Sequence, residues 1–459
     1  MRVSLLALVP SLFLASGISA CGKSDEDTSG GADGADGTDG TDGSDGTDGG
    51  ADCVEEGGAC VLEGAITSDM TLTADKPWLL RSAVTVGDDS SAVTLTIEPG
   101  TSIYGESASN GFLVVTRGAR ILAEGTAAAP IRFTSDQPEG SRARGDWGGL
   151  AINGRAPINA CADGATPCEA EGEGGTGKYG GDDPTDDSGV LKYVVIEFGG
   201  TEISPDNEIN GLGLQGVGSG TEIDYIQIHR NLDDGIEFFG GNVGVKHLLI
   251  TAPGDDGIDW DLGFQGKIQF AAVIQGTDVG NHGMETDNNE ENHAATPASS
   301  PTIANLTLVG SSGIAEDNFG LLLRRGSQPE IYGLAATGFS SGCLAIRDQT
   351  TFDAFANSDA MITASALACT NPYEDSAEET ETGTEEGVFE GDSSNKLLAD
   401  LGLSDPFSAT APDLRPAGGS ALLGAGATPS DAFFTATTYI GAFDESEDWT
   451  AGWTTFAAN

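Results

Sequence analysis

Six short apolar runs recur along the middle of the chain, and they align on one another. Within each run, apolar and variable residues alternate over about six positions. Alternation of period two is typical of a half-buried β-strand, so each run is predicted to form one strand. The runs begin at Leu191, Ile223, Val245, Ile268, Ile303 and Ile331.

A second series of predicted strands lies between the first, and each member begins with a glycine. The members are Gly213-Leu214, Gly235-Ile236, Gly257-Ile258, Gly283-Met284, Gly320-Leu321 and Gly342-Cys343. Most are separated by about 22 residues, a period typical of a solenoid whose parallel sheets gain one strand per turn. The connections are too short and too rich in Gly and Asp for a barrel or doubly wound fold, and the Leu/Asn consensus of leucine-rich repeats is absent. The sequence therefore predicts an all-β fold, a right-handed parallel β-helix.

Changes in composition divide the chain further. An Asp-Gly repeat without any apolar residue larger than alanine is predicted to form a disordered acidic tether. A solenoid needs its ends covered, so we expect a short N-terminal cap at Cys53/Cys60 and a C-terminal closing segment that carries Trp449, Trp453 and Phe456. The predicted parts are a signal peptide (1–20), an acylated cysteine and tether (21–52), the β-helix (53–370), an acidic loop (371–400) and the closing segment (401–459).

The N-terminus indicates export and lipid anchoring. Arg2 precedes an apolar run, Val3 to Ile18, which suits a signal peptide and is short for a membrane span. The run ends in Ile-Ser-Ala-Cys, which resembles the lipobox of bacterial lipoproteins. In that family the signal is cleaved before the cysteine, so the resemblance implies a covalent lipid on Cys21 and a membrane anchor. Gly22, in place of the aspartate that favours inner-membrane retention, favours the outer membrane of a bacterial cell envelope and exposure at the cell surface.

The other six cysteines are expected to form disulfides, which exported proteins retain. Six cysteines allow fifteen connectivities, and proximity along the chain favours three local pairs. These pairs are Cys53/Cys60, Cys161/Cys168 and Cys343/Cys369.

The net charge of −52 excludes nucleic acid as an electrostatic partner. The sequence also lacks a His/Cys cluster suited to zinc.

Acidic residues occupy the same place in successive repeats. Each follows an apolar residue that is predicted to point inward, so strand alternation sends the acids outward. Coils of a β-helix lie about 4.8 Å apart, so these carboxylates would form a column in which Gln215 precedes the first acid. Such a column repels itself unless a hard cation such as calcium binds it, or unless Arg324 pairs with an acid of the preceding coil. The predicted calcium ligands are Glu237, Asp259, Asp261, Glu285 and Asp287.

Residues 65–370 resemble the β-helix domains of bacterial surface proteins in the pectin-lyase-like superfamily. Polygalacturonases of that superfamily use aspartates on adjacent coils followed by a histidine, and "GDDG" followed by "NHG" is similar in order and spacing. Pectate lyases use calcium with an arginine base, and Asp261, Asp287 and Arg324 resemble that set. The Asn-Thr-Asp, Gly-His-Gly and Arg-Ile-Lys motifs of the polygalacturonases are absent. The catalytic candidates that the resemblance implies are Asp256, Asp259, His282 and Arg324.

A structural explanation competes with both chemical ones. Aspartate before glycine is common at β-helix corners, where its side chain caps the turn. This accounts for Asp233, Asp234, Asp255 and Asp256 without any ligand. We therefore expect a non-catalytic surface module of the envelope, whose acidic face binds calcium, a polysaccharide or an envelope protein. The alternative, a polysaccharide lyase or glycoside hydrolase, predicts an open groove along this face, whereas a scaffold predicts acids that fill turns beneath inserted loops.

Overall fold

The structure is a computed structural model that describes residues 53–161, 164–204, 207–314, 317–374 and 381–459. The predicted signal peptide, Cys21 and the tether lie outside the described residues. No helix within the described residues is long and apolar enough to cross a membrane.

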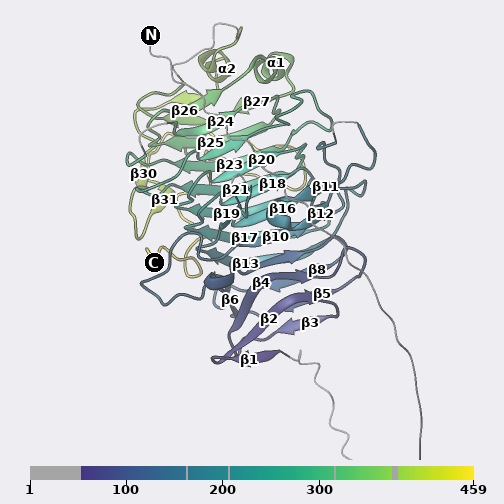
Figure 1. The fold of residues 1–459 in the computed structure, drawn as a ribbon. Coiled ribbons are helices and arrows are strands. Elements are labelled where there is room, and N and C mark those ends of the chain that lie inside the picture. The colour runs from purple at the N-terminus through teal and green to yellow at the C-terminus, as the bar shows by residue number, and fades with distance from the viewer. Residues whose placement is uncertain (1–52, 162–163, 205–206, 315–316, 375–380) are drawn as a thin grey trace, which may run out of the picture. The chain divides into compact units, whose positions relative to one another are not determined.

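The described chain coils into a parallel β-helix, as the sequence predicts (Figure 1). The six predicted runs, the first beginning at Leu191 and the last at Ile331, pair in the predicted register. The first residue of each run lies beside the first residue of the next run. They form the long strands β13 (Gly189–Glu197), β17 (Glu222–His229), β19 (Gly244–Thr251), β21 (Lys267–Ile274), β23 (Thr302–Val309) and β25 (Glu330–Thr337).

Each long strand bends in the middle, so that one strand contributes to two faces of the coil. Pairing between β17 and β19 omits Tyr225 and His247, which have φ angles of 57° and 46°. This is the left-handed region, which bulky residues seldom adopt. The rings of the bend residues stack from coil to coil, Tyr193 on Tyr225 at 4.4 Å, Tyr225 on His247 at 4.2 Å and His247 on Phe270 at 4.9 Å. The stacking favours the bend, and among the six long strands a glycine stands at it only in β25, where Gly333 has a φ angle of 74°.

The third face is built of short strands, and it carries the acids. Its members are β7 (Phe112–Val115), β10 (Leu150–Asn153), β16 (Leu212–Gln215), β18 (Ile236–Phe239), β20 (Ile258–Asp261), β22 (Met284–Thr286), β24 (Phe319–Leu323) and β26 (Gly342–Ile346).

The predicted register of this face is wrong at its two ends. Leu212 pairs with Ile236, so Gly213 and not Gln215 lies beside Glu237. Because "GLGL" offers two Gly-Leu steps two residues apart, strand alternation fits either register. At the other end Leu321 pairs with Leu344, whereas the predicted alignment placed Leu321 beside Cys343, one residue earlier.

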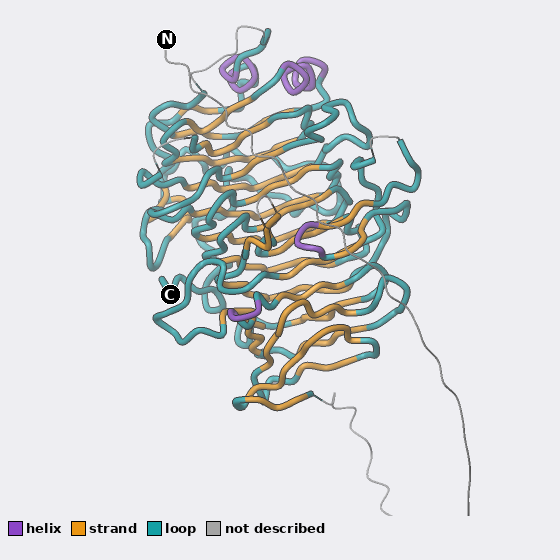
Figure 2. Tube along the Cα trace, in the orientation of Figure 1, coloured by secondary structure: helices purple, strands orange, loops and turns teal. Residues whose placement is uncertain are grey.

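The first and last coils are completed by further strands and one short 3₁₀ helix (Figure 2). On the N-terminal side these are β1 (Val54–Glu56), β2 (Ala59–Ile66), β3 (Met70–Leu72), β4 (Trp78–Val86), β5 (Thr94–Ile97), β6 (Ser102–Gly105), η1 (Ser107–Ser109), β8 (Arg120–Glu124) and β9 (Ile131–Ser135). On the C-terminal side they are β27 (Met361–Thr363), β28 (Ala366–Ala368) and β29 (Lys396–Leu397). Loops carry β11 (Ala170–Gly172), η2 (Glu173–Gly175), β12 (Gly177–Tyr179), β14 (Glu202–Ser204), β15 (Asn207–Glu208), β30 (Leu403–Asp405) and β31 (Asp413–Pro416).

One continuous core runs along the inside of the coils. Ile236, Ile258 and Met284 are fully buried in it, as the inward side of the alternation requires. The core also contains Phe352 of α1 (Gln349–Asn357) and Phe389 of α2 (Glu385–Glu390). These two helices lie at the C-terminal end of the stack (Figure 1). The predicted acidic loop is therefore partly a helix, because burial of Phe389 anchors it.

The C-terminal segment lies elsewhere than predicted. It runs along the flank of the long strands, beside the bend residues, and does not cover the last coil (Figure 1). Trp453 packs edge-on against Tyr193, and the Gln227 side chain donates to the carbonyl of Thr455 at 2.7 Å. His229 Nε2 lies 2.7 Å from the carbonyl oxygen of Ala457. The stacked rings of the bend residues form an apolar strip on the outside of the coils, and the tryptophans cover this strip. The C-terminal segment therefore covers a flank of the β-helix and not one of its ends.

All three predicted disulfides are present, Cys53–Cys60, Cys161–Cys168 and Cys343–Cys369. The first joins β1 to β2, and the second closes a loop within the insertion between β10 and β13.

Candidate functional site

The residues that precede the glycines form a hydrogen-bonded ladder from coil to coil. Asp234 Oδ1 accepts the backbone N–H of Asp256 at 2.9 Å, and Asp256 Oδ1 accepts the N–H of His282. His282 Nδ1 accepts the N–H of Phe319 at 3.2 Å. These side chains satisfy backbone donors that the corner would otherwise bury unpaired. The structural explanation therefore holds for Asp234 and Asp256, although the backbone partner lies on the next coil and not in the same turn.

The predicted column lies on the outer side of the same strands. Glu237 pairs in register with Asp259, and Ile258 pairs with Met284, which places Glu285 next in line. Each of the three side chains is half-buried. Asp261 and Asp287 occupy the second predicted column, since the N–H of Asp287 donates to the carbonyl of Trp260. The sequence thus placed all five predicted ligands on one face.

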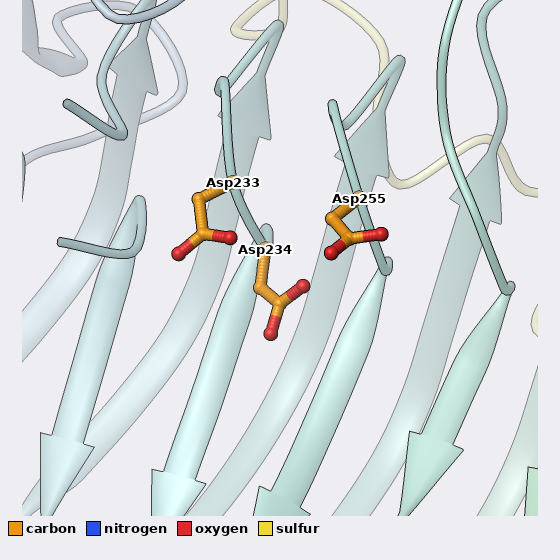
Figure 3. Close-up of side chains that lie close together, drawn as sticks. All are labelled: Asp233, Asp234 and Asp255. Atoms are coloured by element: carbon orange, nitrogen blue, oxygen red, sulfur yellow. The ribbon is translucent and has the colours of Figure 1, made fainter. Parts of the chain in front are cut away.

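The acids of this face meet in three groups, in each of which one oxygen per residue lies within 4.8 Å of the others, and two of the groups join turn acids to column acids. Figure 3 shows the first, in which Asp233 and Asp234 precede β18 and Asp255 precedes β20. The groups are Asp233, Asp234 and Asp255; Asp234, Glu237 and Asp259; and Asp256, Asp259 and Glu285.

Seven carboxylates of this face form no ion pair with any cation in the described part of the chain. They are Asp233, Asp234, Glu237, Asp255, Asp256, Asp259 and Asp261. Burial, and next the neighbouring carboxylates, raise the pKa of Asp234, Glu237, Asp259 and Asp261 well above the ordinary range. Burial and the charge of Asp255 raise the pKa of Asp233 to about 7. The face therefore concentrates carboxyl groups whose ionisation is disfavoured, because no cation of the described residues compensates their charge.

Arginines border this acidic face on one side only. Arg324 Nη2 pairs with Glu285, and Arg324 Nε lies 2.8 Å from Asp287 Oδ1. Pairing of Arg324 with an acid of the preceding coil is one of the two ways of relieving repulsion within the column that the sequence predicted. Arg325 reaches Asp287 at 2.6 Å and Glu290 at 2.8 Å. Both arginines belong to the coil after Glu285, so the earlier coils receive no guanidinium.

The insertion between β10 and β13 packs over the acidic face. Ile158 and Tyr179 form an apolar cluster with Phe239 of β18, and the insertion's Asn159 donates to Asn288 Oδ1 at 2.8 Å. Burial, and next the charge of Asp261, raise the pKa of Tyr179. The same insertion brings Glu173 to the face, where burial raises its pKa to about 7. The insertion therefore packs beside Phe239 and borders the acidic face, while Glu237 and Asp259 stay half-buried.

The catalytic candidates are brought together, but His282 and Arg324 are engaged by other groups of the protein. His282 is 1% exposed, its Nδ1 holds a backbone amide, and its Nε2 lies 3.5 Å from Glu285. Burial lowers the pKa of His282 to about 4, so the imidazole is neutral near pH 7 and offers the acids no charge. Arg324 is held by two carboxylates. Surface cavities of about 580 and 860 Å³ lie elsewhere, at Lys246 and Phe433 and between α1 and α2.

One residue of this face, Asn210, was missed in the sequence. Asn210 Nδ2 donates to Glu237 Oε2 at 2.5 Å, and Asn210 occupies the corner position that Asp234 occupies one coil later. The signal that could have found it is the correct glycine alignment, in which Gly211 and not Gly213 matches Gly235.

The stacked parallel coils and the acid-bearing face define a protein of the parallel β-helix class. The model of the family described as "Pectate-lyase like beta helix domain" matches residues 64–414, and the chain belongs to that family. No curated protein and no solved structure matches the chain.

Proposed function

We propose that this protein is an exported, lipid-anchored module of the bacterial cell envelope, non-catalytic, whose acidic face binds divalent cations. Support for export comes from the lipobox-like sequence at Cys21 and from three disulfides, which persist in oxidising compartments. Residues 21–52 would then act as a tether between the membrane and the β-helix. A polysaccharide or an envelope protein is the partner class that such a surface module would meet.

The observation that carries the cation proposal is the set of seven carboxylates without a protein counter-charge. A buried or half-buried carboxylate must pair, bind a metal or become protonated. Calcium accepts six to eight oxygen ligands from carboxylates, carbonyls and amides, which this face offers from three successive coils. Bound calcium would link those coils and hold the face together.

The test is calorimetric titration of calcium into the full chain. We expect micromolar binding that is lost in the double variant Asp259→Asn/Glu285→Gln, which neutralises the middle of the column. The matched control is Asp405→Asn/Glu330→Gln, because both acids are exposed and lie outside the acidic face. The tether's acids contribute equally to both proteins. Equal high-affinity binding by the two double variants would disprove the site.

The family description supports one second candidate, cleavage of an acidic polysaccharide by a calcium-dependent lyase. Arg324 would be its base, but this guanidinium is bonded to Glu285 and Asp287. Incubation of the calcium-loaded protein with polyuronates, followed by ultraviolet absorbance of unsaturated products, tests it. Product formation that disappears in Arg324→Gln would favour the lyase over the non-catalytic module.

A further inference from the structure

Two of the acidic groups share one residue. Asp234, Glu237 and Asp259 form one triad, and Asp256, Asp259 and Glu285 form the other, with oxygens in each within 4.8 Å of one another. Asp259 lies on β20, the middle of the three strands, between Glu237 on β18 and Glu285 on β22. A carboxylate has two oxygens and about four acceptor positions, so a single aspartate can bind two cations at once.

Unpartnered oxygens point to a ligand at the first triad. Asn210 is 3% exposed and its amide head lies against Glu237, to which Nδ2 donates. Its Oδ1 is buried and has no hydrogen-bond partner among the described residues. Asp259 Oδ1 is likewise buried and unpartnered. Leaving such atoms unpaired is costly, and amide and carboxylate oxygens are both ligands that calcium accepts.

The two triads differ in their access to positive charge. Arg324 Nη2 already pairs with Glu285, so a cation at the second triad would compete with a guanidinium. Asp234 and Glu237 have no ion pair within the described residues. The first triad also lies against the amide head of Asn210, whose Oδ1 is unpartnered among the described residues, whereas the second lies next to the buried, neutral ring of His282.

We propose that the acidic face binds two hard divalent cations bridged by Asp259, one tightly at Asp234, Glu237 and Asn210, the other more weakly at Asp256 and Glu285. The weaker position fills second, because the cation must displace Arg324 from Glu285. This inference rests on the proposed cation-binding function and adds its stoichiometry, its bridging ligand and its order of filling.

The experiment uses Mn²⁺ as a probe, with calorimetry and electron paramagnetic resonance on the full chain. We expect two sites that differ at least tenfold in affinity, and a spin-coupled spectrum only when both are filled. Glu237→Gln should remove the tight site and Glu285→Gln the weak one, while Asp259→Asn, which removes a ligand shared by both triads, should weaken both sites and abolish the coupling. Arg324→Gln should tighten the weak site at least tenfold and leave the tight site within twofold. The control is again Asp405→Asn/Glu330→Gln.

The outcomes separate this inference from the function on which it rests. One site, or two sites without coupling, would overturn the bridged pair and leave cation binding intact. No site above the control's background would overturn both. Unchanged affinity of the weak site in Arg324→Gln would overturn the competition. Circular dichroism in chelator checks that each variant folds. If Asp259→Asn does not fold, the stoichiometry is decided by Glu237→Gln and Glu285→Gln, each of which should lose a different site.

Discussion

Replacing Trp453 by alanine should release the C-terminal segment from the flank while leaving the coils folded. Trp453 is 1% exposed, packs edge-on against Tyr193 and Tyr225 with ring centroids 5.7 and 6.2 Å away, and donates from Nε1 to the carbonyl of Trp449 at 2.8 Å. A buried tryptophan removes about 200 Å² from water, worth about 5 kcal/mol at about 25 cal/mol per Å². Observed losses for such truncations are about 3–5 kcal/mol.

Hydrogen exchange measures this loss locally. The amide of Thr455 donates to Gln227 Oε1 at 2.8 Å, so its protection reports attachment of the segment. Since about 1.4 kcal/mol corresponds to a tenfold change in an equilibrium constant, exchange at Thr455 should accelerate about 100- to 4000-fold. Amides of β17 and β19 should keep their protection, because their partners lie in neighbouring coils.

The matched control is Phe407→Ala, since Phe407 is 62% exposed and belongs to the same C-terminal region. It should change exchange at Thr455 by less than about threefold, as surface substitutions cost within about 0.5 kcal/mol. Wild-type protection at Thr455 in Trp453→Ala would refute the reasoning. So would equal loss of protection in β17, because the segment and the coils would then unfold as one unit.

Three further predictions concern the charge of Asp259, the pKa of His229 and the membrane anchor at Cys21. In chelator at pH 8, Asp259→Asn should raise the melting temperature, because about 3 kcal/mol of repulsion acts between charges about 4.8 Å apart at an effective dielectric constant of about 20. In calcium the same substitution should lower the melting temperature. A lower melting temperature in both conditions would contradict this prediction. Burial lowers the pKa of His229 from 6.5 to about 4, so its contribution is present above pH 6.5 and lost as pH falls toward 4. Wild type should therefore lose about 2 kcal/mol more than His229→Gln between pH 7 and pH 5, measured by denaturant melts, and parallel curves would contradict it. Cys21→Ser should move the protein from the membrane fraction to the soluble fraction, and an unchanged distribution would exclude the lipid anchor.

The insertion explains part of what a linear pattern cannot reveal. Residues 154–181 contain no repeat, yet they place Tyr179 and Glu173 over the acidic face. Whether an outward acid is solvated or covered depends on where a loop far away in the sequence folds back. Local alternation carries no information about that.

The sequence by itself determined the class of fold, the register of the long strands, the three disulfides and the side of the short strands on which the acids lie. These follow from local rules, because a period of two fixes the face of each residue and a constant repeat fixes which residues stack. The tertiary structure alone decided the register at "GLGL", the bend at Tyr225 and the place of the C-terminal segment. It also decided that turn acids and column acids meet, since each triad joins residues from different coils whose approach depends on the shape of the corner. Contacts between coils depend on packing along the whole stack, and no short stretch of sequence specifies them.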